Sequence, residues 1–333
     1  MSRETLSPAR PPSAPGARRR PDLDPEERAD GALRRLLATL FEAMRSNEEG
    51  VRRAQDPEAL HDYRVALRRT RTALGQVPAV FAEAQVEGFR RELAWLGEVT
   101  GSRRDYDVLL ESLESYLEDL PPPMRDDISP LRRFIIEREA HEQEELVAAL
   151  DSDRYRRLIR GWERFLGRRR ASSPVPANAA RPVRAVAGAC LVKAARQVVR
   201  RAEKVGPESP AAEVHRLRIA AKKLRYLLEL FRSLYPRQEA ERLVRLLKGL
   251  QDVLGAHHDL ATQKRSLAAF AQELAASGAA PASTLLAAGY LLARLDDRQA
   301  KLGKRLGGEL SKYLRPTHRE RQRRLFQSQE DRP

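Results

Sequence analysis

Apolar residues recur at three- and four-residue spacing along most of the chain from Gly31 onward, a pattern typical of amphipathic helices. Leu, Ala, Arg and Glu dominate, and no run of alternating β-branched residues indicates a strand. Gly- and Pro-rich breaks interrupt the pattern at residues 75–78, 100–102, 120–124, 168–182, 205–210, 235–236 and 276–283. These breaks divide the body into about eleven helices, so we predict an all-α fold.

The longest break, residues 168–182, separates two stretches that repeat each other. A gap-free shift of 154 residues places LHDYRVALRRTRTAL (60–74) over VHRLRIAAKKLRYLL (214–228). The pairs are His61 with His215, Arg64 with Arg218, Arg68 with Lys222, Arg69 with Lys223 and Arg71 with Arg225. We therefore predict two copies of one helical module, 32–167 and 183–314, joined by a linker at 168–182.

Each of these two helices is predicted to carry an apolar face and, beside it, a basic face. The apolar positions are Leu60, Tyr63, Leu67, Thr70 and Leu74, repeated as Val214, Leu217, Ala221, Leu224 and Leu228. The basic positions are His61, Arg64, Arg68 and Arg71, which we name the first row, and His215, Arg218, Lys222 and Arg225, the second row. Each row is about 15 Å long, at the helical rise per residue.

Cations at these spacings repel one another, and no acidic residue interrupts either row to relieve this repulsion. Three explanations fit: an anionic ligand, carboxylates from a neighbouring helix, or a solvated face. We favour the ligand, because a solvated face has no reason to repeat the same charges in both halves.

The two row histidines are predicted to lie near the helix starts, with Asp56 and Ser209 as N-caps and prolines at the first helical positions. We favour anion binding as their role; structural hydrogen bonding is the second alternative and metal ligation the third.

Gly101 and Gly255 match at the repeat offset and are predicted to end a helix, with Asp105 and Asp259 in the first turn of the next one. A less favoured alternative makes these aspartates metal ligands, together with the carboxylates of Glu98 and Asp252.

The chain has a net charge of +15 and a pI near 10.4, which favours polyanionic partners. Most of this charge lies in the body, because residues 1–31 are neutral overall. The segment 1–31 is expected to be disordered and 315–333 to be a basic tail. A single cysteine and the lack of any long apolar run predict a cytoplasmic protein without a disulfide, signal peptide or membrane span.

The pattern H-x-x-R-[VI]-x-x-[RK]-[RK]-x-R, followed later by G-x-x-x-D and present twice, resembles the CHAD family, the conserved histidine α-helical domain. The segment LDSDRYRRLIRGWERFL (150–166) is also similar to a helix of that family, and the resemblance extends over about residues 32–314. It implies two four-helix bundles related by a pseudo-twofold axis. It also implies that their basic helices line a shared groove that binds inorganic polyphosphate.

Transferred by motif position, the resemblance assigns polyphosphate binding to His61, Arg64, Arg68, Arg69, Arg71, His215, Arg218, Lys222, Lys223 and Arg225. Secondary ligands are expected at Arg91 and Arg245, for which a salt bridge is nearly as well supported, and at the stripe of Lys193, Arg196 and Arg200. The motifs TGSRRD and LGAHHD depart from the family pattern. They leave open the roles of Arg103, Arg104, His257 and His258.

Three functions compete at this stage. The leading one is a non-catalytic polyphosphate-binding module that associates with polyphosphate granules or with a separately encoded phosphate-metabolising enzyme. The second is nonspecific binding of nucleic-acid phosphates, which is disfavoured because Tyr63 and Tyr226 are the only aromatic residues on the motif helices. The third, a phosphoanhydride-processing enzyme, lacks a Walker loop and an E-x-E-x-K pattern, so we predict no catalytic residue, metal or cofactor.

Overall fold

A computed structural model describes residues 21–54, 56–168, 175–206 and 209–327. These residues form eleven α-helices and one 3₁₀ turn and no strand, which confirms the predicted all-α fold. The helices are α1 (Ala29–Arg53), α2 (Pro57–Gln76), α3 (Glu83–Leu117), α4 (Pro122–Asp127), α5 (Ser129–Asp151), α6 (Asp153–Gly167), α7 (Val183–Ala202), α8 (Ala211–Leu230), α9 (Arg237–Ala276), α10 (Ala282–Tyr313) and α11 (Pro316–Phe326).

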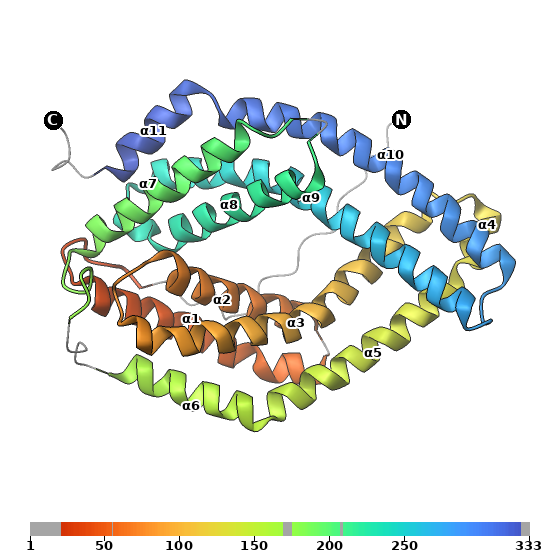
Figure 1. The fold of residues 1–333 in the computed structure, drawn as a ribbon, viewed down its shortest axis with the longest axis horizontal. Coiled ribbons are helices and arrows are strands. Elements are labelled where there is room, and N and C mark those ends of the chain that lie inside the picture. Colours follow the sequence, from red (N-terminus) through yellow and green to blue (C-terminus); the bar gives the residue numbers. More distant parts are fainter. Residues whose placement is uncertain (1–20, 55, 169–174, 207–208, 328–333) are drawn as a thin grey trace, which may run out of the picture.

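The starts of the helices repeat along the chain. Helices α7, α8 and α9 each begin 154 residues after α1, α2 and α3, the same offset that aligns the two sequence motifs. Figure 1 shows α1 to α3 and α7 to α9 as two groups that face each other, and α2 packs against α8 where the groups meet. The two motif helices therefore lie together at the junction of the two halves.

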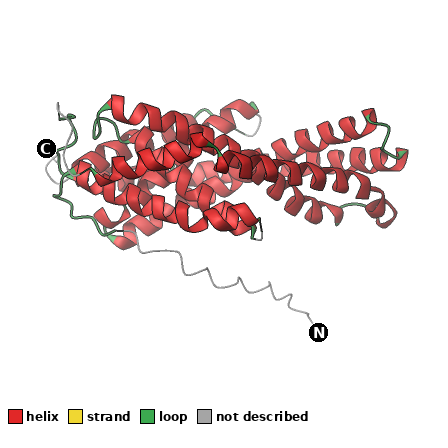
Figure 2. Ribbon diagram, turned by 90° about the horizontal axis from the view of Figure 1, so that it is seen from below, coloured by secondary structure: helices red, strands yellow, loops and turns green. Residues whose placement is uncertain are grey.

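Both hydrophobic cores draw side chains from both halves of the chain. The larger core buries the predicted apolar faces of α2 and α8, including Tyr63 and Leu224, neither of which is exposed to solvent. The smaller core joins the C-terminal parts of α3 and α9 to α4, α5 and α10. Figure 2 shows these helices extending as an arm from the main body. Because the apolar faces of α2 and α8 are buried in the core, the adjacent basic faces are the ones left to contact a ligand.

The predicted helix ends at Gly101 and Gly255 are wrong. Helix α3 continues from Glu83 to Leu117 and α9 from Arg237 to Ala276, so Asp105 and Asp259 lie in the middle of helices. A glycine inside a helix costs about 1 kcal/mol relative to alanine, which packing along such long helices readily offsets.

The structure confirms one of the predicted N-caps and corrects the other. The carboxylate of Asp56 accepts a hydrogen bond from the backbone N–H of Glu58 at 2.9 Å. Helix α8, however, begins at Ala211 with Pro210 as its N-cap, because Pro210 has extended backbone angles. The Ser209 hydroxyl instead accepts a hydrogen bond from the N–H of Gly206.

Part of the expected N-terminal disorder is also wrong. Residues 1–20 lie outside the described part of the chain, but Leu23 is buried and the N–H of Val183 donates to the carbonyl of Glu27. Within the predicted linker, 169–174 are not described, while the N–H of Asn178 donates to the carbonyl of Ala79. These contacts hold the N-terminal segment against the start of the second half and the linker against the first half.

The region expected only as a basic tail contains α11, which packs on α7. Phe326 of α11 is buried. Its backbone comes close to α7 at Gly188, where a Cβ would overlap the carbonyl oxygen of Phe326. None of the described helices combines the length and apolar character needed to cross a membrane.

Candidate functional site

The first row lies on α2 against α3. Nη1 of Arg64 donates to the carbonyl of Gly97 at 3.1 Å and to the hydroxyl of Thr100 at 3.0 Å. A Cβ on Gly101 would lie 3.3 Å from the same nitrogen. Gly101 therefore makes room for the guanidinium of Arg64 and does not end the helix.

The charge of Arg64 is held in an unfavourable environment. Burial is the largest cause that lowers its pKa to about 10; the neighbouring cation Arg68 acts in the same direction and Asp105 in the opposite one. Arg64 forms no ion pair within 4 Å among the described residues, and its hydrogen-bond partners are neutral groups on α3. It is still protonated at neutral pH, so an anion placed beside it would relieve this cost.

The second row lies on α8 against α9. Here Nη2 of Arg218 forms an ion pair with the Asp259 carboxylate at 3.1 Å. Burial, together with the nearby cations Arg218 and Arg68, lowers the pKa of Lys222 to about 8. The ammonium group of Lys222 is therefore largely charged at neutral pH but close to losing its proton.

Charges from the two rows act on each other across the junction. Arg68 on α2 lowers the pKa of both Arg218 and Lys222 on α8. Desolvation raises the pKa of Asp105, and the equivalent Asp259 raises it further. The structure thus brings cations of both halves into one region in which two aspartates only partly compensate them.

Several of these arginines carry buried donors that are not hydrogen-bonded. Among the described residues, seven buried side-chain polar atoms lack a hydrogen-bond partner, and four of them are Nε atoms of the motif arginines Arg68, Arg69, Arg218 and Arg225. Buried donors are rarely left unsatisfied in proteins. Oxyanions are suitable partners, because a guanidinium donates to two oxygens at once.

The row histidines are half-buried near the start of each helix. Burial lowers the pKa of His61, and the nearby guanidinium of Arg104 is the charge that lowers it most. His215 instead contacts His258, with the two Nδ1 atoms 3.3 Å apart. Both row histidines are therefore near other groups that donate hydrogen bonds or carry positive charge.

The other predicted motif cations have different surroundings. Arg69 forms an ion pair with Glu229 of α8 at 2.8 Å, and Nε of Arg225 lies 3.7 Å from the same carboxylate. Arg71 is exposed and crosses Gly97, where a Cβ would overlap its guanidinium. Lys223 is half-buried and forms no ion pair among the described residues. Arg69 thus already links the two halves, while Arg71 stays open to solvent.

The secondary residues have surroundings of their own. Arg91 lines a cavity between α3 and α6 together with Arg154 and Arg157. Arg245 is exposed on α9. Neither residue forms an ion pair within the described part of the chain, so the alternative of an interhelical salt bridge is wrong for both.

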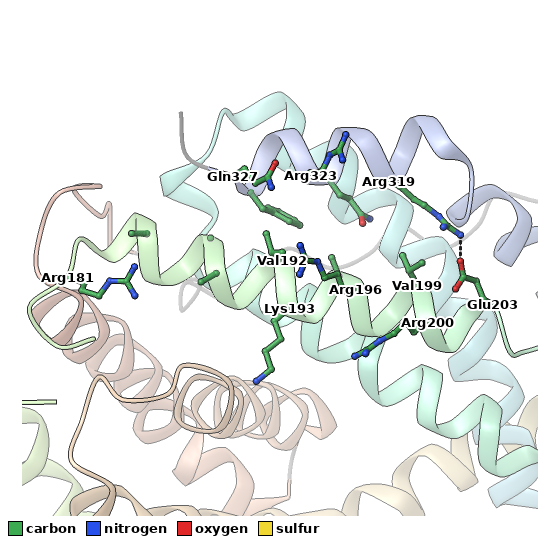
Figure 3. Close-up of a pocket in the computed structure, with 16 residues that line it drawn as sticks. Arg181, Val192, Lys193, Arg196, Val199, Arg200, Glu203, Arg319, Arg323 and Gln327 are labelled. Carbon is green, nitrogen blue, oxygen red and sulfur yellow. Dashed lines mark hydrogen bonds and ion pairs between the residues drawn. The ribbon is translucent and has the colours of Figure 1, made fainter. Parts of the chain in front are cut away.

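The stripe of Lys193, Arg196 and Arg200 borders a cavity of about 920 Å³ between α7 and α11. Figure 3 shows Lys193 and Arg200 extending from the side of α7 that faces away from α11, and Arg319 of α11 paired with Glu203. The sequence does not predict this cavity, because one of its walls is α11, a segment expected to be a basic tail.

Sequence reasoning also missed several polar residues that shape the main site. Thr100 is fully buried and Glu229 is shared by two motif arginines. The sequence pairs Asp105 with Asp259. These aspartates lie beside the row cations only because α3 and α9 continue through Gly101 and Gly255. Within the described residues, no three His, Cys, Asp or Glu side chains are arranged to hold a metal ion.

The fold and the two basic rows define a helical protein with duplicated motif helices packed at one junction. The family model of the CHAD domain matches residues 35–268, and the chain belongs to this family.

The structure is similar to the crystal structure of the CHAD domain from the plant Ricinus communis, with a TM-score of 0.71 and 28% identity over 88% of this chain and 95% of that one. It also shares its fold with PptA from Streptomyces chartreusis, with a TM-score of 0.62 and 18% identity over 86% and 99% of the two chains. A comparison with curated proteins found no match.

Proposed function

We propose that the two rows form one surface that binds inorganic polyphosphate without chemical conversion of the ligand. The observation that carries this proposal is the convergence of Arg64, Arg68, Arg218 and Lys222 from both halves, with burial or mutual repulsion lowering pKa values in the cluster. A chain of closely spaced phosphates compensates such a cluster along its length. The family membership of the chain supports the same ligand.

Nucleic acid is the alternative ligand, because it offers the same phosphate charges. Binding of single strands normally adds stacking of bases on exposed aromatic side chains. Tyr63 is fully buried and Tyr226 is 8% exposed, so the motif helices offer no such platform. The arrangement therefore favours a polyanion without bases.

The test is a calorimetric titration of the full chain with long-chain polyphosphate, single-stranded RNA and duplex DNA at matched phosphate concentration and fixed salt. The variant under test replaces Arg64, Arg68, Arg218 and Lys222 with Ala. The control variant removes the same formal charge at exposed arginines outside the rows, by replacing Arg53, Arg156, Arg237 and Arg324 with Ala.

We expect polyphosphate to bind at least about tenfold more tightly than either nucleic acid, and only the row variant to lose this preference. Equal affinity for all three polyanions would show that the surface is generic positive charge. Equal losses in both variants would show that net charge, and not this site, determines binding.

A further inference from the structure

His61 and His215 lie near the same position of the repeat, but that position holds a different residue in each half. The repeat offset pairs Arg104 with His258. In the first half, Arg104 lies near enough to His61 to lower its pKa, and it forms an ion pair with Asp107 at 3.3 Å. In the second half, the rings of His215 and His258 are 4.7 Å apart between centroids. A permanent cation thus accompanies one row histidine, and a second titratable ring accompanies the other.

The surroundings of His258 keep it uncharged. The charged or titratable groups that act on it are Arg218, His215 and Lys222 on α8 and Arg265 on α9, all of which disfavour its protonation. Burial is the largest cause, and together these effects lower the pKa of His258 to about 4. The adjacent Asp259 carboxylate is engaged by Arg218, and the position equivalent to Asp107 is Ala261.

The contact between the two rings has a chemical consequence. A hydrogen bond between two Nδ1 atoms requires one of them to carry hydrogen and the other to accept it. Adding a proton to this pair next to Arg218 and Lys222 is costly unless negative charge arrives at the same time. Phosphate oxygens bound by these two cations would supply that charge.

We propose that His258 is an additional anion-binding residue, and that the His215–His258 pair takes up a proton when polyphosphate occupies the second row. Binding at His258 is then pH-dependent, whereas the equivalent position of the other half carries the permanently charged guanidinium of Arg104. This inference rests on the polyphosphate binding proposed above.

The direction of the pH effect follows from linkage. A bound phosphate raises the pKa of the pair above its value in the free protein, so protons are taken up on binding. Affinity therefore increases as pH falls from the pKa of the bound state toward that of the free state, by at most about tenfold per pH unit for one linked proton.

The experiment measures binding of long-chain polyphosphate to the full chain at about pH 8 and about pH 6, at fixed ionic strength and in buffers of different ionisation enthalpy. The variants are His258→Asn, His258→Arg and the reciprocal Arg104→His, with His257→Asn as the neighbouring control. Wild type should take up protons on binding and bind severalfold more tightly at the lower pH.

His258→Asn should reduce the proton uptake and flatten the pH dependence. His258→Arg should bind severalfold more tightly than wild type at the higher pH. The slope of log affinity against log salt concentration should become steeper by about the contribution of one neutralised phosphate. Arg104→His should weaken binding at the higher pH and add pH dependence, while His257→Asn should behave as wild type.

Proton uptake by His258→Asn equal to that of wild type would overturn the role of His258 while leaving polyphosphate binding in place. Absence of polyphosphate binding by wild type would overturn the proposed function, and this inference with it. Because Arg104→His tests the same idea in the other half, a folding defect in one variant leaves the question decidable.

Discussion

Arg64 and Arg218 occupy the same position of the repeat but are held by different partners. Arg64 donates to a backbone carbonyl and a threonine hydroxyl, whereas Arg218 is paired with the Asp259 carboxylate. Among the described residues, the first row therefore has no ion pair, whereas the second row neutralises part of its charge through Asp259 and Glu229. A duplicated motif can thus preserve its residues while its two copies differ in their electrostatic role.

This difference predicts unequal losses when the two halves are altered separately. Replacing Arg64 and Arg68 with Ala should weaken polyphosphate binding by about 100-fold, and replacing Arg218 and Lys222 by about tenfold, because Asp259 already compensates Arg218. The measurement is a titration of both double variants at one salt concentration. Equal losses of affinity in the two double variants would show that the ion pair between Arg218 and Asp259 breaks without a free-energy cost when the ligand binds.

Asp259→Asn should make the second half resemble the first. Releasing Arg218 from its carboxylate should raise the affinity for polyphosphate severalfold and lower the stability of the free protein, since one more cation loses its partner. Binding titrations and thermal unfolding without ligand would measure both effects. Unchanged affinity would indicate that Arg218 stays directed toward residue 259 in the complex.

Lys222→Met should stabilise the free protein while weakening binding. The pKa of Lys222 is about 8 in the fold against an ordinary value of 10.5, so the unfolded chain binds more protons between these two values. Wild-type stability should therefore rise with pH across this window, and Lys222→Met should remove that rise. Near pH 7 we expect an increase in Tm of about 2–4 °C in thermal unfolding scans. A lower Tm would mean that the ammonium group is stabilising.

The smallest expected effects concern the two equivalent glycines. A Cβ on Gly255 would meet only Asp259 at 4.0 Å, so Gly255→Ala should stabilise α9 by about 0.5–1 kcal/mol and leave binding unchanged. Gly101→Ala should gain less, because the new Cβ crowds Arg64, and it should weaken binding by a few fold. Chemical denaturation and titration of the two variants test this contrast, which equal behaviour would contradict.

Local sequence patterns predicted the parts of the fold that depend on helical periodicity. The apolar spacing identified the buried faces of α2 and α8, and Asp56 was correctly placed as an N-cap. The predicted break at Gly101 failed because its role depends on a side chain from another helix, Arg64, which no local signal reports. Likewise, α11 is short and strongly polar, and its packing on α7 depends on a distant glycine, Gly188.

The candidate site shows the same division. The repeated spacing predicted which cations share a helix face, but the partners of Arg69, Arg218 and His215 come from α8 or α9. Those partners become visible only when these helices are packed against one another, and only the pair of Arg69 with Glu229 joins the two halves. A self-comparison extended to every polar position would have paired Arg104 with His258 in advance, since they match at the same offset.

The central claim is that both rows bind one ligand on one surface. The most direct test is the stoichiometry of a short polyphosphate of defined length, measured by calorimetry for wild type and for the two double variants, Arg64→Ala with Arg68→Ala and Arg218→Ala with Lys222→Ala. We predict one binding event in all three proteins, with unchanged stoichiometry and lower affinity in each variant. Two events in wild type, one of which disappears in each variant, would show two separate sites and contradict the account.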